Sequence, residues 1–242
     1  MSKYLKKISI KGFQEVSLLD WDGKIASILF LPGCNFRCPF CHSPSLVTGH
    51  NELEDIPFEI IQEYLKKRRD WVDAVVITGG EPTIHEDIFE LIYALKALSY
   101  SVKLDSNGTN PEALREIIKQ RLIDYFAIDI KAPFTNGCSQ YNKAAGVNVD
   151  IESIAESVKL VISSGIDHEF RTTAVPGIIG RSQIMEIARS LNGAKKYCIQ
   201  QFVTRETLDP SYLNIKPYQK EELERLALLA GEHLNNVKVR FN

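Results

Sequence analysis

Three cysteines in one short loop are the residues of this chain best suited to metal chemistry. Cys34, Cys38 and Cys41 stand in the segment Cys-Asn-Phe-Arg-Cys-Pro-Phe-Cys, directly after an apolar run at 25–31 that predicts a buried strand. Thiolates ligate both iron–sulfur clusters and zinc. A metal ion that prefers four ligands would lack one at a site built from three thiolates. A [4Fe–4S] cluster held by these three cysteines would keep one iron open to another molecule.

A structural zinc site is the alternative for this loop. Zinc needs a fourth ligand, and His42 is adjacent to Cys41. Adjacent residues converge poorly on one tetrahedral ion, and no second Cys/His pair stands at zinc-finger spacing. We therefore favour the cluster and expect His42 beside the ligands rather than among them. Cys138 and Cys198 are too isolated for a second cluster, and we expect a loop cysteine and a strand cysteine.

Composition narrows the class of protein. The chain has 242 residues, 44% hydrophobic and 25% charged, with a net charge of −2, which allows one large core or two modest domains. Without a basic excess we expect no nucleic-acid partner. No apolar run approaches the roughly 18 residues of a membrane span, and the basic start is not followed by the apolar stretch of a secretory signal. Crowded, unpaired cysteines fit a reducing compartment, so we expect a cytoplasmic protein.

Strand-like and helix-like segments alternate along the chain. Strands are expected at 25–31, 74–78, 102–105, 125–130, 168–175, 197–203 and, as a short addition, 237–241. Helices are expected at 57–69, 87–98, 111–120, 151–164, 181–191 and 218–235. Six strand–helix units predict an α/β fold with a parallel sheet, arranged as a partial (β/α)6 TIM-type barrel. We expect one domain over 1–242, with 1–24 as a lead-in and 25–242 as the partial barrel.

Polar residues gather where these strands end, which is where such folds carry their chemistry. The cysteine loop follows the first strand. The later positions are Gly79-Gly80-Glu81-Pro82 after the second strand, Asp105-Ser106-Asn107-Gly108 at the third, Asp129 and Lys131 at the fourth, Arg171 on the fifth, and Gln200 and Gln201 on the sixth. The sequence therefore predicts one polar rim.

The cysteine pattern, with Phe40 as the aromatic residue before the last cysteine, resembles that of the radical S-adenosylmethionine (SAM) superfamily. The resemblance continues through the Gly-Gly-Glu-Pro, Asp-Ser-Asn-Gly-Thr and Asp-Ile-Lys motifs in the same order. Within that superfamily, segments 19–23, 33–42 and 170–177 resemble the activating enzymes of glycyl-radical proteins. The first two are most similar to the branch that activates anaerobic ribonucleoside-triphosphate reductase.

The resemblance implies a radical SAM fold and a specific reaction. A reduced [4Fe–4S] cluster binds SAM at its open iron and cleaves it to methionine and a 5′-deoxyadenosyl radical. The radical takes hydrogen from a glycine of a partner enzyme, here first an anaerobic ribonucleotide reductase, with flavodoxin or ferredoxin as electron donor. One element is not matched: Asp22-Gly23-Lys24-Ile25 stands where the pyruvate formate-lyase activase has an Asp-Gly-Pro-Gly-type segment that holds the target loop.

The resemblance also assigns residues to SAM. They are Phe40, Gly79, Gly80, Glu81, Asp105, Ser106, Asn107, Asp129, Lys131 and Arg171. The backbone of the glycines would bind the methionine ammonium, Phe40 the adenine, and Lys131 either the SAM carboxylate or Asp129. Asp105 and Asp129 would lie near the methionine end of SAM. A monovalent cation bound there, with the Ser106 hydroxyl as a further ligand, and a site without any cation are equally weighted alternatives.

Plainer interpretations remain open for these motifs. The Gly-Gly-Glu-Pro segment alone could be an ordinary strand-to-helix turn with an exposed Glu81. The aspartates could cap strand ends beside an Asn107-Gly108 turn, and Lys131 could be solvated. Two other functions also stay open: a radical SAM synthase acting on a small molecule such as a modified-base precursor, and a non-enzymatic, zinc-stabilised binding module.

Overall fold

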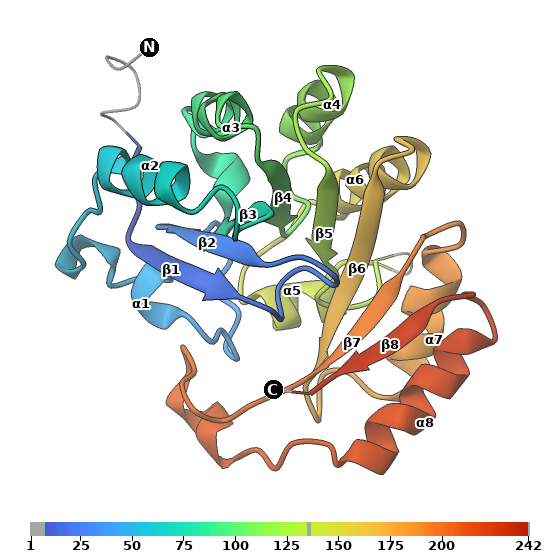
Figure 1. Ribbon diagram of the computed structural model, residues 1–242. Helices are drawn as coiled ribbons and strands as arrows, with labels where there is room; N and C mark the ends of the chain where they lie inside the picture. Colours follow the sequence, from blue (N-terminus) through green and yellow to red (C-terminus); the bar gives the residue numbers. More distant parts are fainter. Residues whose placement is uncertain (1–7, 135–136, 242) are drawn as a thin grey trace. The chain divides into compact units, whose positions relative to one another are not determined.

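A computed structural model describes residues 8–134 and 137–241 of the chain, in which strands and helices alternate (Figure 1). The strands are β1 (Gly12–Ser17), β2 (Ala26–Leu31), β3 (Ala74–Gly79), β4 (Ser101–Ser106), β5 (Tyr125–Asp129), β6 (Asp167–Ala174), β7 (Tyr197–Gln201) and β8 (Val237–Arg240). The α-helices are α1 (Pro44–Val47), α2 (Phe58–Lys67), α3 (Ile88–Ala97), α4 (Pro111–Lys119), α5 (Ser139–Ala145), α6 (Ile151–Ser163), α7 (Arg181–Ser190) and α8 (Lys220–Gly231). Short 3-10 helices are η2 (His50–Glu52), η3 (Pro82–Ile84) and η4 (Pro210–Asn214).

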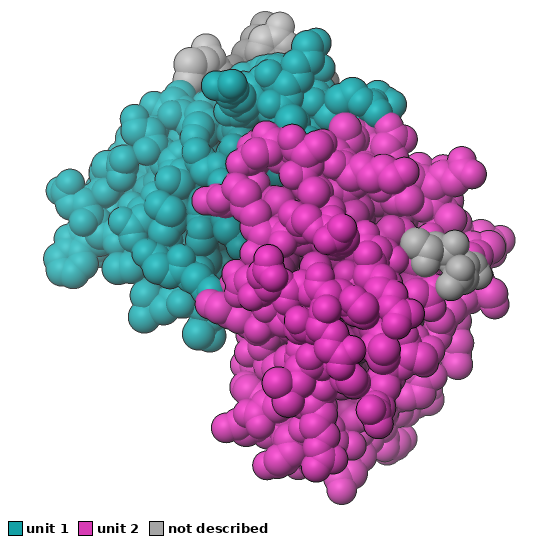
Figure 2. Space-filling model, turned by 90° about the vertical axis from the view of Figure 1, so that its right-hand side faces the viewer, with its two compact units in different colours: residues 1–35, 45–106, 112–126 teal, residues 36–44, 107–111, 127–242 magenta. Residues whose placement is uncertain are grey.

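The described residues form two compact units, coloured teal and magenta in Figure 2. The first unit takes in the described residues up to 35, then 45–106 and 112–126. The second takes in 36–44, 107–111 and the described residues from 127 onward. The chain therefore passes from one unit to the other inside the cysteine loop and inside β5. The expected single domain over 1–242 stays a prediction.

The sheet of the first unit has the strand order β1-β2-β3-β4. β1 pairs antiparallel with β2, whereas β2, β3 and β4 pair in parallel. Leu31 lies opposite Gly79 in this register, so the segments after β2 and β3 leave the sheet at the same edge. One face carries a buried cluster of Trp21, Ala26, Ile28, Ala74 and Val76.

The second unit is built on parallel strands as well. β6, β7 and β8 pair in parallel, with Arg171 opposite Cys198 and Cys198 opposite Lys238. The segment after β5 joins β6, because the Ile130 N–H donates to the Arg171 carbonyl at 2.8 Å. α8 packs against α7, β7 and β8, with its buried Leu226 on the inner side. These pairings confirm the predicted α/β class with a parallel sheet.

The sequence pattern missed one strand. β1 lies within 1–24, where only a lead-in was expected, and it is antiparallel. Three of its six residues are exposed, so it lacks the buried apolar run by which a central strand is recognised. A change of register between Gln14 and Ser17 further interrupts its alternation of apolar and polar residues.

The remaining differences concern short helices and helix ends. α5 was not predicted, because only Tyr141, Ala144 and Ala145 of its seven residues are buried. The helix expected over 218–235 is shorter and covers Lys220–Gly231. Among the described residues, none of the helices combines the length and apolar character that crossing a membrane requires.

Candidate functional site

The cysteine loop is held by backbone hydrogen bonds within the second unit. The Arg37 N–H donates to the Ala145 carbonyl at the end of α5 at 2.8 Å. The Asp209 N–H donates to the Pro39 carbonyl at 2.9 Å, next to η4. Gly146 has a φ of +70°, and a Cβ there would lie 2.0 Å from the Arg37 carbonyl oxygen. A glycine is thus required for α5 to approach the loop this closely.

The three loop cysteines offer thiol donors. None of the five cysteines forms a disulfide; Cys38 is buried, whereas Cys34 and Cys41 are partly exposed. Cys34 belongs to the first unit, and Cys38 and Cys41 to the second. Among the described residues, no three His, Cys, Asp or Glu side chains already converge as a metal site. The assignment as cluster ligands therefore depends on residue type and spacing, and that donor set fits an iron–sulfur cluster.

The other side chains of the loop pack inside the second unit. Phe40 is buried, with its ring centroid 6.4 Å from that of Tyr212. His42 is stacked on Phe202 at 6.0 Å. Burial, and then the charge of Lys131, lower the pKa of His42, so its imidazole is neutral near pH 7. The adenine contact expected of Phe40 stays a prediction.

The two glycines after β3 sit where no side chain fits. Gly79 has a φ of +123°, and a Cβ there would lie 2.3 Å from the Leu31 carbonyl oxygen. A Cβ on Gly80 would lie 1.7 Å from the carbonyl oxygen of Gly33, the residue before Cys34. The Glu81 N–H donates to that same carbonyl at 2.8 Å. The turn after β3 is therefore packed directly against the start of the cysteine loop.

Glu81 holds this turn in place. Its side chain is buried, which excludes the exposed turn residue of the plainer interpretation. Its Oε1 accepts hydrogen bonds from the Thr83 N–H at 3.0 Å, the Thr83 hydroxyl at 2.6 Å and the Ser106 hydroxyl at 2.8 Å. Glu81 thereby caps η3 and links the end of β3 to the end of β4.

Replacing Gly80 by alanine is expected to disrupt both halves of this arrangement. The added Cβ must displace the Gly33 backbone, which should lower the free energy of unfolding by about 1–3 kcal/mol and reduce iron incorporation at Cys34. Gly231→Ala is the matched control, because a Cβ in that last position of α8 meets nothing within 4 Å. Urea unfolding and iron content measure the two effects. Equal values for the two variants would contradict the packing role.

The middle of β4 contains a buried charged residue that the sequence pattern did not single out. Lys103 is buried, and its Nζ lies 3.7 Å from Asp105 Oδ1. Its position two residues before Asp105, on the same face of the strand, was the available signal. Asn107 behaves as the turn interpretation expects, since its Oδ1 accepts from the Thr109 N–H at 3.0 Å and the Thr109 hydroxyl at 2.6 Å.

Asp129, Lys131 and Arg171 come together in the second unit. Arg171 Nε donates to Asp129 Oδ1 at 2.7 Å, and Lys131 Nζ to Asp129 Oδ2 at 3.0 Å. Arg171 therefore points toward Asp129. Of the alternatives for Lys131, the structure shows the ion pair with Asp129. The Lys131 N–H also donates to the buried Tyr141 hydroxyl at 3.4 Å.

Electrostatics keeps this trio charged. Burial alone raises the pKa of Asp129, but Arg171 and Lys131 outweigh it and hold that pKa well below its usual value. Burial lowers the pKa of Lys131, and the charges of Asp129 and of a Cys38 thiolate reverse that shift, so this pKa lies above its usual value. One carboxylate between two cations leaves a net positive charge, which suits an anionic group.

A second group of buried charges lies on β6, β7 and β8 and was also missed. Glu169 is 1% exposed and pairs with Lys196 at 2.9 Å and with Arg240 at 3.3 Å. Cys198, the expected strand cysteine, is buried in β7, and burial raises the pKa of its thiol. Cys138, exposed just before α5, is the expected loop cysteine.

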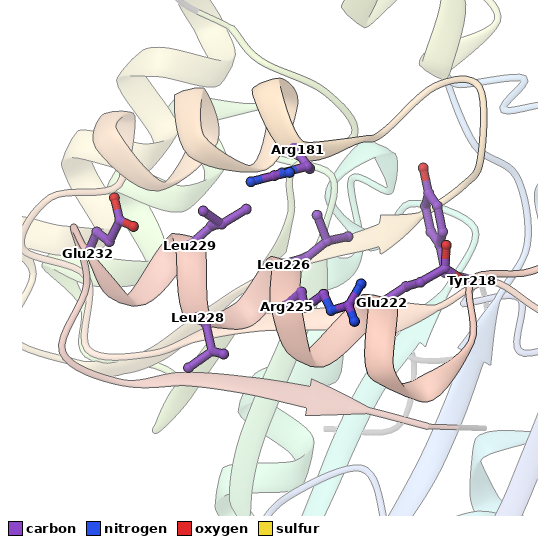
Figure 3. A pocket seen from close by; sticks show the side chains of 8 residues that line it. All are labelled: Arg181, Tyr218, Glu222, Arg225, Leu226, Leu228, Leu229 and Glu232. Carbon is purple, nitrogen blue, oxygen red and sulfur yellow. The ribbon is translucent and has the colours of Figure 1, made fainter.

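A cavity of about 570 Å³ lies beside α7 and α8 in the second unit (Figure 3). It is lined by Arg181, Tyr218, Glu222, Arg225, Leu226, Leu228, Leu229 and Glu232. None of these described lining residues is among those assigned to SAM. The cavity is therefore separate from the candidate site.

Comparison with known proteins identifies the class. The profile of the family described as the Radical SAM superfamily matches residues 28–191. The chain belongs to this superfamily and is a radical SAM oxidoreductase. Membership of the family implies a [4Fe–4S] cluster and SAM. Membership of an enzyme family argues against the non-enzymatic zinc module.

Individual relatives refine the placement. A Methanocaldococcus jannaschii protein, provisionally named a glycyl-radical enzyme activating enzyme, is 32% identical, with 97% of this chain and 96% of that protein covered. This supports the activating branch. A Pyrococcus horikoshii protein, provisionally named a GTP 3′,8-cyclase, is 31% identical over 126 residues, covering 52% of this chain and 39% of that protein.

A solved structure confirms the fold. Streptococcus suis SuiB bound to S-adenosylmethionine superposes with a TM-score of 0.65 at 19% identity, covering 89% of this chain. The match covers 51% of the SuiB chain, so the present chain spans about half of that protein. The likeness is consistent with the predicted partial TIM-type barrel.

Proposed function

We propose that this enzyme activates a glycyl-radical enzyme, with an anaerobic ribonucleotide reductase as the first candidate partner. The observation that carries the proposal is the 32% identity to the M. jannaschii activating enzyme along nearly the whole of both chains. The match takes in 97% of this chain and 96% of that protein, so the similarity extends beyond the motifs that bind the cluster and SAM.

Cys34, Cys38 and Cys41 would hold the [4Fe–4S] cluster, since they are thiols without disulfide partners on one loop. When bound, the cluster and SAM supply one-electron chemistry that removes one hydrogen atom from a partner glycine and yields methionine and 5′-deoxyadenosine. A flavodoxin or ferredoxin is the proposed electron donor. The residues of the chain must bind and orient SAM and exclude competing reactions.

The turn after β3 would bind the SAM ammonium through backbone oxygens. The N–H groups of Gly80 and Glu81 already donate to the carbonyls of Leu31 and Gly33, at 2.9 and 2.8 Å. The turn would therefore offer carbonyl oxygens, which accept from an ammonium. Glu81 would act indirectly, because its Oε1 is engaged by Thr83 and Ser106.

The Asp129 trio would lie at the carboxylate end of SAM. Asp129 fixes the side chains of Lys131 and Arg171, each through one oxygen. A carboxylate approaching the two cations would meet donors that are already oriented, which lowers the entropic cost of binding. Asp105 would lie near the methionine portion, as the motif order implies.

The test is anaerobic mixing of the reconstituted protein, SAM and a reductant with the reductase from the same organism. Electron paramagnetic resonance should show a glycyl radical signal that is lost when the target glycine is replaced by alanine. SAM cleavage without that signal, in the presence of folded reductase, would contradict the assignment of this partner.

A radical SAM synthase acting on a small molecule is the second candidate. It is favoured by the similarity of about half of this chain to the P. horikoshii GTP 3′,8-cyclase. Such an enzyme would consume a metabolite and SAM without any protein partner. Mass spectrometry of a small-molecule extract incubated with the reduced enzyme would reveal that metabolite as a changed mass.

A further inference from the structure

Lys103 is the most unusual charge in the first unit. Its side chain is 1% exposed on β4. Across the β3–β4 ladder it lies opposite Val76, a member of the apolar cluster that includes Trp21. Lysine is rarely buried unless it is paired, because an ammonium loses its hydration in apolar surroundings. The position therefore depends on specific partners.

Three groups of different kinds surround the Lys103 ammonium. It donates to the main-chain carbonyl of Asp20, in the segment between β1 and β2. It lies 3.7 Å from Asp105 Oδ1 and 5.4 Å from the centroid of the Tyr125 ring. A carbonyl oxygen, a carboxylate and an aromatic face are all groups that attract cations. The ammonium is thus held in a cation-binding cage.

These contacts bear on the monovalent cation that resemblance to the activating enzymes implies at the aspartates Asp105 and Asp129, with Ser106 as a further ligand. Asp105 Oδ1 already lies within ion-pair range of the Lys103 ammonium, at 3.7 Å, although this distance is longer than a hydrogen bond. The Ser106 hydroxyl donates to Glu81 Oε1 at 2.8 Å and contributes to holding the turn after β3. A second cation at Asp105 would be repelled by the ammonium at close range. The residues present do not fit a bound alkali ion.

We infer that the Lys103 ammonium replaces the monovalent cation in this enzyme. It acts as a positioning residue, because its charge compensates that of Asp105 at 3.7 Å and it is not itself proposed to touch SAM. The inference extends the proposed SAM site and is independent of which partner the enzyme activates. Since the charge is covalently attached, the site should not respond to the alkali-ion concentration.

Lys103→Met tests this directly, because it keeps most of the buried stem and removes the charge. Lys196→Met is the matched control: Lys196 is another largely buried lysine, paired with Glu169 at 2.9 Å. The melting temperature of the apoprotein and the affinity of the cluster-loaded protein for SAM are measured in potassium, sodium and choline chloride at equal ionic strength.

The wild-type protein should give the same values in all three salts. Lys103→Met should bind SAM about tenfold more weakly in choline, a coupling of ordinary size between neighbouring sites, with recovery in potassium or sodium. Its melting temperature should follow the same order of salts. Lys196→Met should show no difference between choline and the alkali ions.

Three results would overturn the inference or its link to SAM. A wild-type protein that binds SAM more weakly in choline uses an alkali ion, whether or not Lys103→Met folds. If a folded Lys103→Met variant gave the same melting temperature and the same SAM affinity in all three salts, no alkali ion would be taking the place of the missing ammonium. Recovery of melting temperature without any change in SAM affinity would uphold the replacement and place SAM away from Asp105.

Discussion

Replacing Cys38 by alanine is expected to abolish cluster binding and SAM cleavage together. With one of three thiolates gone, the remaining two would leave a second iron without its protein ligand. We expect formation of 5′-deoxyadenosine to fall by at least about a thousandfold, equivalent to about 4 kcal/mol of lost transition-state stabilisation. Iron and sulfide analysis after anaerobic reconstitution, followed by reduction with SAM, measures both losses.

Cys198→Ala is the control for the loss of a cysteine. Cys198 is also buried, 1% exposed against 7% for Cys38, and belongs to β7 rather than to the cysteine loop. It should retain the iron and sulfide of the wild-type protein and most of its activity. A Cys38→Ala protein that keeps a full four-iron cluster and cleaves SAM normally would contradict the ligand assignment.

Replacing Asp129 by alanine is expected to have the second-largest effect. The change leaves the side chains of Arg171 and Lys131, 11% and 17% exposed, without the carboxylate between them. Hydrogen bonds to a charged group contribute about 1.5–3 kcal/mol, so the free energy of unfolding should fall by about 2 kcal/mol. Affinity for SAM should fall about a hundredfold, because the two cations lose their fixed orientation.

The same residue predicts a pH dependence. The folded-state pKa of Asp129 lies below its usual value of 3.8. The stability it contributes is therefore fully present above about pH 4–5 and is lost as the pH falls toward the folded pKa. Urea unfolding of the apoprotein should show this loss in the wild-type protein and a smaller loss in Asp129→Ala.

Asp167→Ala provides the matched control for Asp129. Asp167 pairs with Lys195 at 2.8 Å, but its side chain is 71% exposed, so the pair should contribute well under about 1 kcal/mol. Asp167→Ala should lower the free energy of unfolding much less than Asp129→Ala does, and it should leave the affinity for SAM unchanged. If Asp129→Ala matched this control in both measurements, the ion-pair account of the trio would be wrong.

Much of this architecture was predictable because buried parallel strands leave a strong pattern. β2 and β3 are almost wholly buried, so their apolar runs predicted both strands within one residue. β1 and α5 were missed for the opposite reason, since exposed or short polar elements leave no such run. Their tertiary contacts decide their structure.

The site divides in the same way. Glycines at Gly79 and Gly80 and the loop cysteines were recognisable because their chemistry allows few substitutes. The buried hydrogen bonds of Glu81 and the pairing of Lys103 were not, because sequence spacing does not reveal which side chains meet across neighbouring strands. A lysine within an apolar strand, on the same face as an aspartate, is the sequence pattern that would have indicated this buried ion pair.

The most direct test of the central claim follows the hydrogen atom. The reductase is prepared with glycine deuterated at the α-carbon and incubated anaerobically with the reconstituted protein, SAM and a reductant. Our account predicts that mass spectrometry finds one deuterium in the 5′-deoxyadenosine as the glycyl radical appears. Unlabelled 5′-deoxyadenosine, formed at the same rate with or without the reductase, would contradict it and direct the search to a small-molecule substrate.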